Sequence, residues 1–298
     1  MGVDHDHGQL DVNQRCVRCA LGLTAAFMLV EVVGGWLSGS LALIADAGHM
    51  LTDALALGLA WVGFWLAKRP PDERRTYGYR RFEVMAGWIN GISLLAIAAW
   101  IVYEALRRLS APHAIDSTLM LVVAVIGLTV NIVVFRILYG GDRKNINVQG
   151  ALLHVIGDML GSLVAIIAAI VIATTGWTPI DPILSLVVAA LLALSAWRLV
   201  RKSTHILLEG TPDDLDIAGI RREITESIAG VEDVHHFHAW SLTTDDHMVT
   251  FHVRIAPDVP HSETLATIKG YLRDTHGITH SVIQIESEAC PEGVSNHP

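Results

Sequence analysis

Two histidine–aspartate pairs are the side chains of this sequence best suited to hold a metal ion. His49 and Asp53 form the first pair, and His154 and Asp158 form the second. A four-residue spacing places both members of a pair on one face of an α-helix. Two imidazole nitrogens and two carboxylate oxygens suit tetrahedral Zn²⁺, whereas Mg²⁺ and Ca²⁺ prefer shells of oxygen atoms. The pattern therefore predicts a zinc site shared by two helices.

Both pairs fall within long apolar stretches. The chain has 298 residues, of which 52% are hydrophobic and 17% charged, with a mean hydropathy of +0.45, a composition typical of membrane proteins. Six stretches are long enough to cross a bilayer as helices: Cys16–Leu37, Leu41–Leu66, Phe82–Leu106, Thr118–Tyr139, Val148–Thr174 and Ile180–Val200. Ionisable residues inside a membrane span are costly and usually mark an ion pathway. We therefore interpret the four residues as a transport site rather than as polar contacts between helices.

Charge divides the chain into two parts. Residues 1–202 carry a formal charge of +2 and residues 203–298 a charge of −11. Lys and Arg gather at the start of the chain, in the loops after the second and fourth stretches, and after the sixth; Arg107 and Arg108 are the exception. Because basic loops face the cytoplasm, we predict a multi-pass protein of the cell (inner) membrane with both termini cytoplasmic. The acidic second part argues against nucleic-acid binding.

The acidic part shows the periodicities of a small folded domain. Helical patterns cover Leu215–Ala229 and Ser262–His276, and strand patterns cover Val234–Leu242, Met248–Ile255 and His280–Glu286. The predicted fold class is an all-α six-helix transmembrane domain followed by a small α+β, ferredoxin-like (αββαβ) cytoplasmic domain. The predicted boundaries are a tail at 1–13, the membrane domain at 14–208, the cytoplasmic domain at 209–288 and a second tail at 289–298.

Alternation along the second and third strands of this domain predicts a second group of ligands. Val249, Phe251, Val253 and Ile255 are expected to face the core, which turns His252 to the opposite face. The same reasoning places His280 and Glu286 on that face, where they can converge with His252 across the strands. A polar face carrying solvated histidines is the plainer alternative.

Several segments resemble those of the cation diffusion facilitator family. They are the second-stretch segment Ser40–Asp53, the segment Tyr77–Glu83, the fifth-stretch segment Asn147–Asp158, the segment His236–Trp240 and the segment His280–Glu286. The resemblance covers about residues 14–288. It implies a homodimeric metal/proton antiporter with alternating access, and the His-Asp/His-Asp set resembles that of the zinc-preferring branch. It also implies that His235 and His261 join His252, His280 and Glu286 in a cytoplasmic zinc site.

One feature of the family is absent, and others remain open. The loop after the second stretch has no histidine before Tyr77, so a zinc site there is not expected; contact between this basic loop and lipid phosphates is the plainer account. Cys16 and Cys19, or His5 and His7, could bind metal, but neither set is specific. Asp46, one turn before His49, could be a fifth ligand or a carboxylate at the mouth of the site, but a solvated residue at a helix end is the plainer account. Asp181-Pro182 is typical of a helix start, with Asp181 as the cap and Pro182 in the first turn.

Other classes of function are alternatives to transport of zinc. Imidazole and carboxylate also accept Cd²⁺, Co²⁺ and Fe²⁺, so an exporter of these ions is an alternative. A membrane-anchored metal sensor would need a single anchoring helix rather than six. A metalloenzyme would need a general base beside the metal, as in His-Glu-x-x-His, and the sequence has no such motif. The chain is therefore not expected to be an enzyme, and its partners are expected to be the lipid bilayer, divalent ions, protons and a second copy of itself.

Overall fold

The computed structural model places most of the chain in two compact units. Unit 1 comprises residues 1–58 and 89–198, and unit 2 comprises residues 59–88 and 199–298. The residues that the structure describes are 22–51, 62, 71–111, 113–139, 146–244 and 246–288, and the side chains of 146–151, 153 and 154 are not among them.

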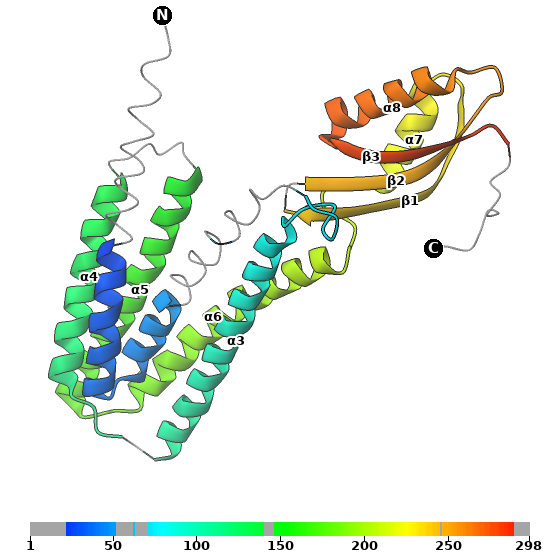
Figure 1. Cartoon of the computed structure of the whole chain (residues 1–298). Coiled ribbons are helices and arrows are strands. Elements are labelled where there is room, and N and C mark those ends of the chain that lie inside the picture. Colours follow the sequence, from blue (N-terminus) through cyan, green and yellow to red (C-terminus); the bar gives the residue numbers. More distant parts are fainter. Residues whose placement is uncertain are drawn as a thin grey trace, which may run out of the picture. The chain divides into compact units, whose positions relative to one another are not determined.

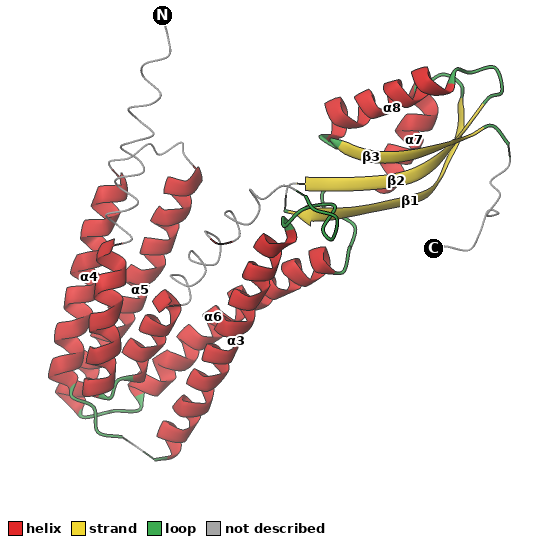
Figure 2. Cartoon of the chain, in the orientation of Figure 1, coloured by secondary structure: helices red, strands yellow, loops and turns green. Residues whose placement is uncertain are grey.

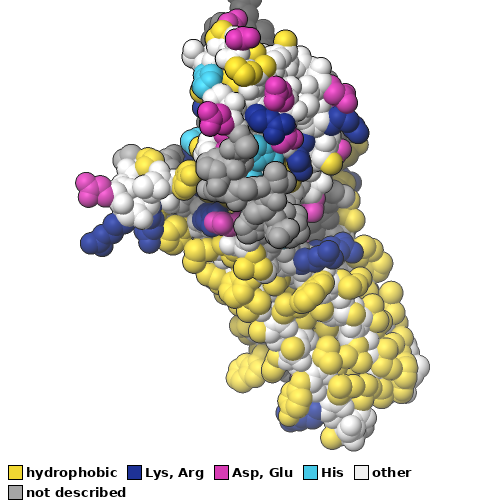
Figure 3. Space-filling view, turned by 90° about the vertical axis from the view of Figure 1, so that its right-hand side faces the viewer, with side chains coloured by type: hydrophobic (Ala, Val, Ile, Leu, Met, Phe, Trp, Pro, Cys, Tyr) yellow, Lys and Arg dark blue, Asp and Glu magenta, His cyan; other side chains and the backbone are white. Residues whose placement is uncertain are grey.

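Four described helices are long and apolar enough to cross a membrane. They are α3 (Arg81–Ser110), α4 (Ser117–Tyr139), α5 (Ile146–Thr175) and α6 (Ile180–Leu207) (Figure 1). Two shorter apolar helices, Gly22–Ser38 and Leu41–Leu51, precede them. Large apolar side chains such as Trp36, Leu191 and Trp197 are exposed, and Figure 3 shows such side chains covering the helical surface. Four of the six predicted spans are thereby confirmed, while the first two predicted stretches extend beyond the described residues.

Close packing joins the helix Gly22–Ser38 to α4. A Cβ atom added to Gly34 would lie 2.6 Å from Cγ2 of Val123, and one added to Gly127 would lie 2.6 Å from Cζ of Phe27. Each helix therefore contributes a glycine that accepts a bulky side chain of the other. Small residues allow this close approach between membrane helices, where dispersion contacts hold the helices together.

An aspartate on α6 holds the start of the helix Leu41–Leu51. The Asp181 carboxylate accepts hydrogen bonds from the Ser40 hydroxyl (2.7 Å) and from the backbone N–H groups of Leu41 (2.8 Å) and Ala42 (3.1 Å). Asp181 is fully buried. The expectation that Asp181 caps its own helix is wrong in detail, because α6 begins at Ile180. Asp181 instead satisfies the free N–H groups at the start of another helix.

The C-terminal domain contains a three-stranded sheet and two helices (Figure 2). The chain order is α7 (Ile217–Ser227), β1 (Val231–Thr243), β2 (Asp246–Ile255), α8 (His261–His276) and β3 (His280–Glu286). The strands lie in the order β1-β2-β3, with β1 antiparallel and β3 parallel to β2. Side chains of α7, α8 and one face of the sheet form a single apolar core. The predicted αββαβ order is confirmed.

A bulge in β1 alters the alternation of its side chains. His235 pairs with His252 and His238 pairs with Thr250, so two residues of β1 face one residue of β2. His236 adopts a φ of 50° within this bulge. Phe237 stacks on Phe251 with ring centroids 4.8 Å apart. The bulge thus sends Phe237 to the core and leaves His235 and His236 side by side on the opposite face.

Candidate metal centres

The described members of the predicted transmembrane quartet lie on two helices of unit 1. His49 is a half-buried residue of the helix Leu41–Leu51, and Asp158 of α5 is 1% exposed. His154 belongs to α5, but its side chain falls outside what the structure describes. Asp53 lies outside the described residues altogether. The structure therefore locates one member of each His-x-x-x-Asp pair.

A contact between Asp46 and Gly161 fixes how these two helices pass each other. A Cβ atom on Gly161 would lie 2.7 Å from Oδ1 of Asp46. The helix Leu41–Leu51 and α5 run in opposite directions (Figure 1). His49 comes one turn after Asp46, and Asp158 comes about one turn before Gly161, so an antiparallel crossing brings His49 and Asp158 to the same level. This is the register that a metal site shared by the two pairs requires.

Buried carboxyl groups gather near the predicted site. Asp46 is 6% exposed, so the expectation of a solvated helix-end residue is wrong, and Glu31 of the helix Gly22–Ser38 is fully buried. The carboxyl groups of Glu31 and Asp46 lie close enough to that of Asp158 for like-charge repulsion when they are ionised. Three carboxyl groups beside one imidazole provide hard and borderline donors for a divalent ion, together with sites that can exchange protons.

Enlarging Gly161 tests this register. Gly161→Ala is expected to lower metal transport about tenfold, because overpacking a tight contact costs about 1–3 kcal/mol and here displaces the Asp46 carboxylate. Gly157→Ala is the matched control, since nothing lies within 4 Å of a Cβ atom at that position of the same helix. Initial flux per folded protein in reconstituted vesicles is the measurement. Equal flux from the two variants would show that the Asp46–Gly161 contact does not position the site.

A second group of potential ligands lies on the face of the three-stranded sheet opposite the core. One ligand atom from each of His235, His252 and Glu286 lies within 4.8 Å of the other two. Nε2 of His235 is 3.1 Å from one Glu286 oxygen, and Nδ1 of His252 is 2.9 Å from the other. Oδ2 of Asp233 lies 3.0 Å from Nδ1 of His235, within hydrogen-bond distance. Such an outer carboxylate orients a metal-binding imidazole.

The Glu286 carboxyl stays ionised in this setting. Burial on its own raises the pKa of Glu286, but the hydrogen bond from Gln284 and the positive charge available on His235 and His252 outweigh burial. The pKa of Glu286 therefore lies below its usual range. An ionised carboxylate between two imidazoles fits the donor set that Zn²⁺ accepts.

Two of the five residues predicted for the cytoplasmic site lie elsewhere. His280 pairs with Met248, whereas Glu286 pairs with Arg254 at the far end of the same two strands. Six residues of extended strand separate His280 from Glu286, about 20 Å. The expected convergence of His280 with His252 is thus wrong, because residues on one face of a strand need not share one site. His261 is an exposed residue at the start of α8.

His236 is the neighbour of this cluster that sequence reasoning missed. Its ring centroid lies 5.1 Å from that of His252 and 5.4 Å from that of His235. Strict alternation would separate His235 and His236, and only the bulge brings both to His252. The consecutive histidines themselves were the signal available in the sequence.

Comparisons with known proteins agree with these features. A profile described as the cation efflux transmembrane domain matches residues 17–208, and one described as the cation efflux protein cytoplasmic domain matches residues 212–288. The chain is 47% identical to zinc transporter ZitB of Escherichia coli over 295 residues, 96% of this chain and 94% of that one. It is 42% identical to metal cation efflux system protein CzcD of Cupriavidus metallidurans, over 98% of this chain and 92% of that one. A cadmium, cobalt and zinc/H(+)-K(+) antiporter of Bacillus subtilis is 40% identical, over 97% and 93% of the two chains.

The apolar helices, the two matching family profiles and these relatives define a multi-pass membrane transporter of divalent cations rather than an enzyme. The chain belongs to the cation efflux family, with both the transmembrane and the cytoplasmic domain of that family. The resemblance seen in the sequence is confirmed.

Proposed function

We propose that this protein exports Zn²⁺ from the cytoplasm in exchange for protons, with His49, Asp53, His154 and Asp158 holding the transported ion. The observation that carries the proposal is the register of the helices, which sets His49 level with buried Asp158. The relatives named as zinc transporters support zinc as the cargo, and the relative named as an antiporter supports exchange.

The chemistry of the ligands accounts for coupling to protons. Only neutral imidazole binds a metal ion, and an unperturbed histidine has a pKa of about 6.5, so protons and zinc compete near neutral pH. Two ionised aspartates neutralise the dication and reduce the cost of holding it in a low-dielectric interior. When the site opens to the outside, protonation of His49 and His154 releases the ion. The protonated site then returns to the cytoplasmic side and exchanges protons for zinc.

Orientation and assembly complete the proposal. The basic loops, with the match of residues 212–288 to a cytoplasmic domain, support an inner-membrane protein whose termini are both cytoplasmic. The same domain supports a homodimer. We assign a second Zn²⁺ to His235, His252 and Glu286, where it would hold the cytoplasmic domain in a conformation that reflects the cytoplasmic zinc level.

Metal-dependent proton movement in proteoliposomes tests the transport proposal. With a pH gradient imposed, Zn²⁺ is expected to dissipate the gradient with saturable kinetics, and Cd²⁺, Co²⁺ and Fe²⁺ are compared at equal concentration. Non-saturable flux that is independent of the pH gradient would indicate a channel. Zinc binding without flux would indicate a sensor, and a stronger response to another ion would reassign the cargo.

Removing one ligand tests the cytoplasmic site. His252→Ala is expected to lower zinc affinity of that site by more than about tenfold, because even partners outside the ligand shell are worth 10–100-fold. His247→Ala is the matched control: His247 lies on the same strand but contacts Ser241 and Asp214 instead. The number and affinity of bound zinc ions are measured on full-length protein by equilibrium dialysis. Identical zinc binding by the two variants would contradict the assignment.

A further inference from the structure

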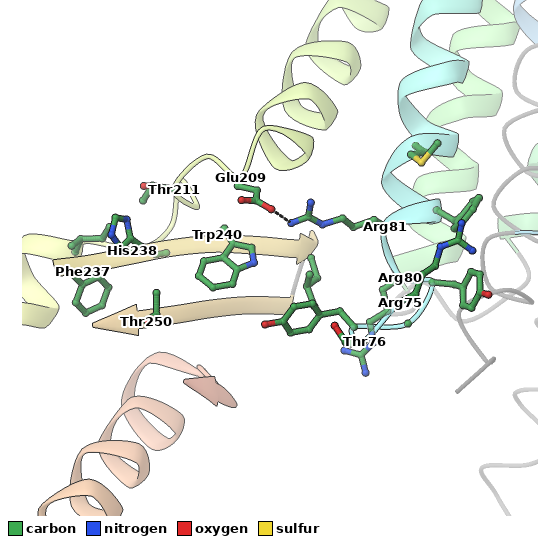
Figure 4. A pocket seen from close by; sticks show the side chains of 18 of the residues that line it. Arg75, Thr76, Arg80, Arg81, Glu209, Thr211, Phe237, His238, Trp240 and Thr250 are labelled. Carbon is green, nitrogen blue, oxygen red and sulfur yellow. Dashed lines mark hydrogen bonds and ion pairs between the residues drawn. The ribbon is translucent and has the colours of Figure 1, made fainter. Parts of the chain in front are cut away.

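Unit 2 contains a large cavity whose lining is rich in arginine. Its volume is about 1070 Å³, just above the usual range of small-molecule sites. The lining comes from three places: the loop before α3 together with the first two turns of α3, the segment after α6 with α7, and the strands β1 and β2. Figure 4 shows the loop arginines on one side and Trp240 of β1 on the other.

The charges around this cavity are strongly unbalanced. The acidic residue in the lining is Glu209. Five lining residues are arginines: Arg74, Arg75, Arg80, Arg81 and Arg221. Two of the five are paired, Arg81 with Glu209 at 2.9 Å and Arg80 with Asp246. Among the described residues, Arg74, Arg75 and Arg221 have no carboxylate in an ion pair. The cavity therefore retains positive charge that favours an anion.

The loop that carries these arginines is built in advance of any ligand. The Asp72 carboxylate accepts hydrogen bonds from the backbone N–H groups of Arg74 (2.9 Å) and Arg75 (2.7 Å) and from the Tyr79 hydroxyl (2.9 Å). The Tyr79 hydrogen bond is the main reason why the pKa of Asp72 lies below its usual range. The Arg75 guanidinium lies 4.6 Å from the centre of the Tyr79 ring. Asp72 thus fixes the shape of the loop through its backbone and Tyr79, and Arg75 is held over the Tyr79 ring.

The cavity adjoins the start of a long apolar helix. Arg81, Phe82 and Met85, in the first turns of α3, line it, and α3 is long and apolar enough to span a membrane. Slightly further along α3, the half-exposed Trp88 donates a hydrogen bond from Nε1 to the Thr204 hydroxyl of α6 (3.0 Å). Tryptophan with its N–H satisfied is typical of the membrane interface. Guanidinium groups bind phosphate through paired hydrogen bonds.

We propose that this arginine-lined cavity binds the phosphate headgroup of an anionic phospholipid. The headgroup phosphate would lie among Arg74, Arg75 and Arg221, while the acyl chains leave along the apolar start of α3. The bound headgroup would join the loop before α3 to the cytoplasmic domain, because Arg221 comes from α7 and Arg74 from the loop. The protein would then be more stable in membranes rich in anionic lipid, because its cytoplasmic domain would be more firmly joined to the loop before α3.

Lipid binding to full-length protein in detergent tests the proposal. Dioleoyl phosphatidylglycerol is expected to bind more tightly than dioleoyl phosphatidylcholine, measured by native mass spectrometry with thermal stability as a second readout. Arg74→Gln and Arg221→Gln are each expected to weaken phosphatidylglycerol binding roughly fivefold, since a basic residue near an anionic surface is worth about that much. Arg222→Gln is the matched control, because Arg222 adjoins Arg221 on α7, is exposed and does not line the cavity.

The outcomes separate the possible anions. Inorganic phosphate and glycerol phosphate, at the same concentration, are expected to give no comparable stabilisation. If they protect the protein as well as the lipid does, the site binds a soluble anion and the lipid assignment is wrong. Equal loss of phosphatidylglycerol binding in Arg74→Gln and Arg222→Gln would also overturn it. Arg74 is exposed and lies in a loop, so its variant keeps the test valid even if Arg221→Gln, which loses a hydrogen bond to the Val234 carbonyl, unfolds.

Discussion

Replacing Asp158 with alanine is expected to abolish proton-driven zinc transport, with flux reduced by more than about 100-fold. Loss of a residue outside the ligand shell already costs 10–100-fold in metal affinity, and loss of a ligand costs more. Asp158 is 1% exposed, so no water replaces its oxygen easily. Its removal also leaves the dication with one neutralising carboxylate instead of two, which raises the cost of holding the ion inside the membrane.

A conservative variant separates charge from packing. Asp158→Asn keeps the shape of the side chain and one oxygen donor but loses the negative charge, and we expect it to be as defective in transport as Asp158→Ala. The control is Asp213→Asn, which removes the same charge from an exposed residue before α7. Initial zinc flux into proteoliposomes is measured for each. If zinc flux of Asp158→Asn equals that of the wild type, the negative charge of Asp158 is not required for transport.

The other three proposed ligands are tested in the same assay. His49→Ala, Asp53→Ala and His154→Ala are each expected to match Asp158→Ala, and combinations are expected to add little, because residues that act as one site are not additive. Undiminished flux in any one of them would remove that residue from the ligand set without affecting the other three.

The sequence was most informative where periodicity decides the structure. The strand His280–Glu286 was predicted with its observed ends, and the buried set Val249, Phe251, Val253 and Ile255 follows directly from alternation on a sheet with one apolar face. The spans of α3, α4 and α6 likewise follow from apolar length. These features depend on neighbours in the chain, and so a local pattern suffices.

The features that sequence reasoning missed depend on contacts between distant residues. Asp46 has the sequence context of a helix end, and its burial results from Gly161 on another helix. The position of His236 depends on a bulge in β1, which alternation along the strand does not predict. Asp181 precedes a proline in a typical helix start, yet its carboxylate serves residues about 140 positions earlier. No local pattern encodes these partners.

Asp181→Ala is expected to produce the largest loss of stability outside the metal sites. Three donors, from Ser40, Leu41 and Ala42, would lose their acceptor in a buried region. A hydrogen bond to a charged group is worth about 1.5–3 kcal/mol, so the loss is expected to be at least about 4 kcal/mol. The helix Leu41–Leu51 carries His49 about two turns beyond this start, and we therefore expect transport to fall together with thermal stability.

Two controls make this result specific to the hydrogen bonds. Ser185→Ala, one turn further along α6, removes a buried hydroxyl that donates to the Asp181 backbone carbonyl (2.7 Å) and is expected to cost about 1 kcal/mol. Ser40→Ala removes one of the three donors. Because Ser40 and Asp181 share a hydrogen bond, the double variant is expected to lose less stability than the two single variants together.

Thermal unfolding in detergent and zinc flux in vesicles measure the two effects of Asp181→Ala separately. A melting temperature and a flux like those of Ser185→Ala would show that the start of the His49 helix does not depend on Asp181. Additive losses for Ser40→Ala and Asp181→Ala would show that the two residues act independently. Loss of flux with stability preserved would instead place Asp181 in the transport cycle itself, because a purely structural link must affect both.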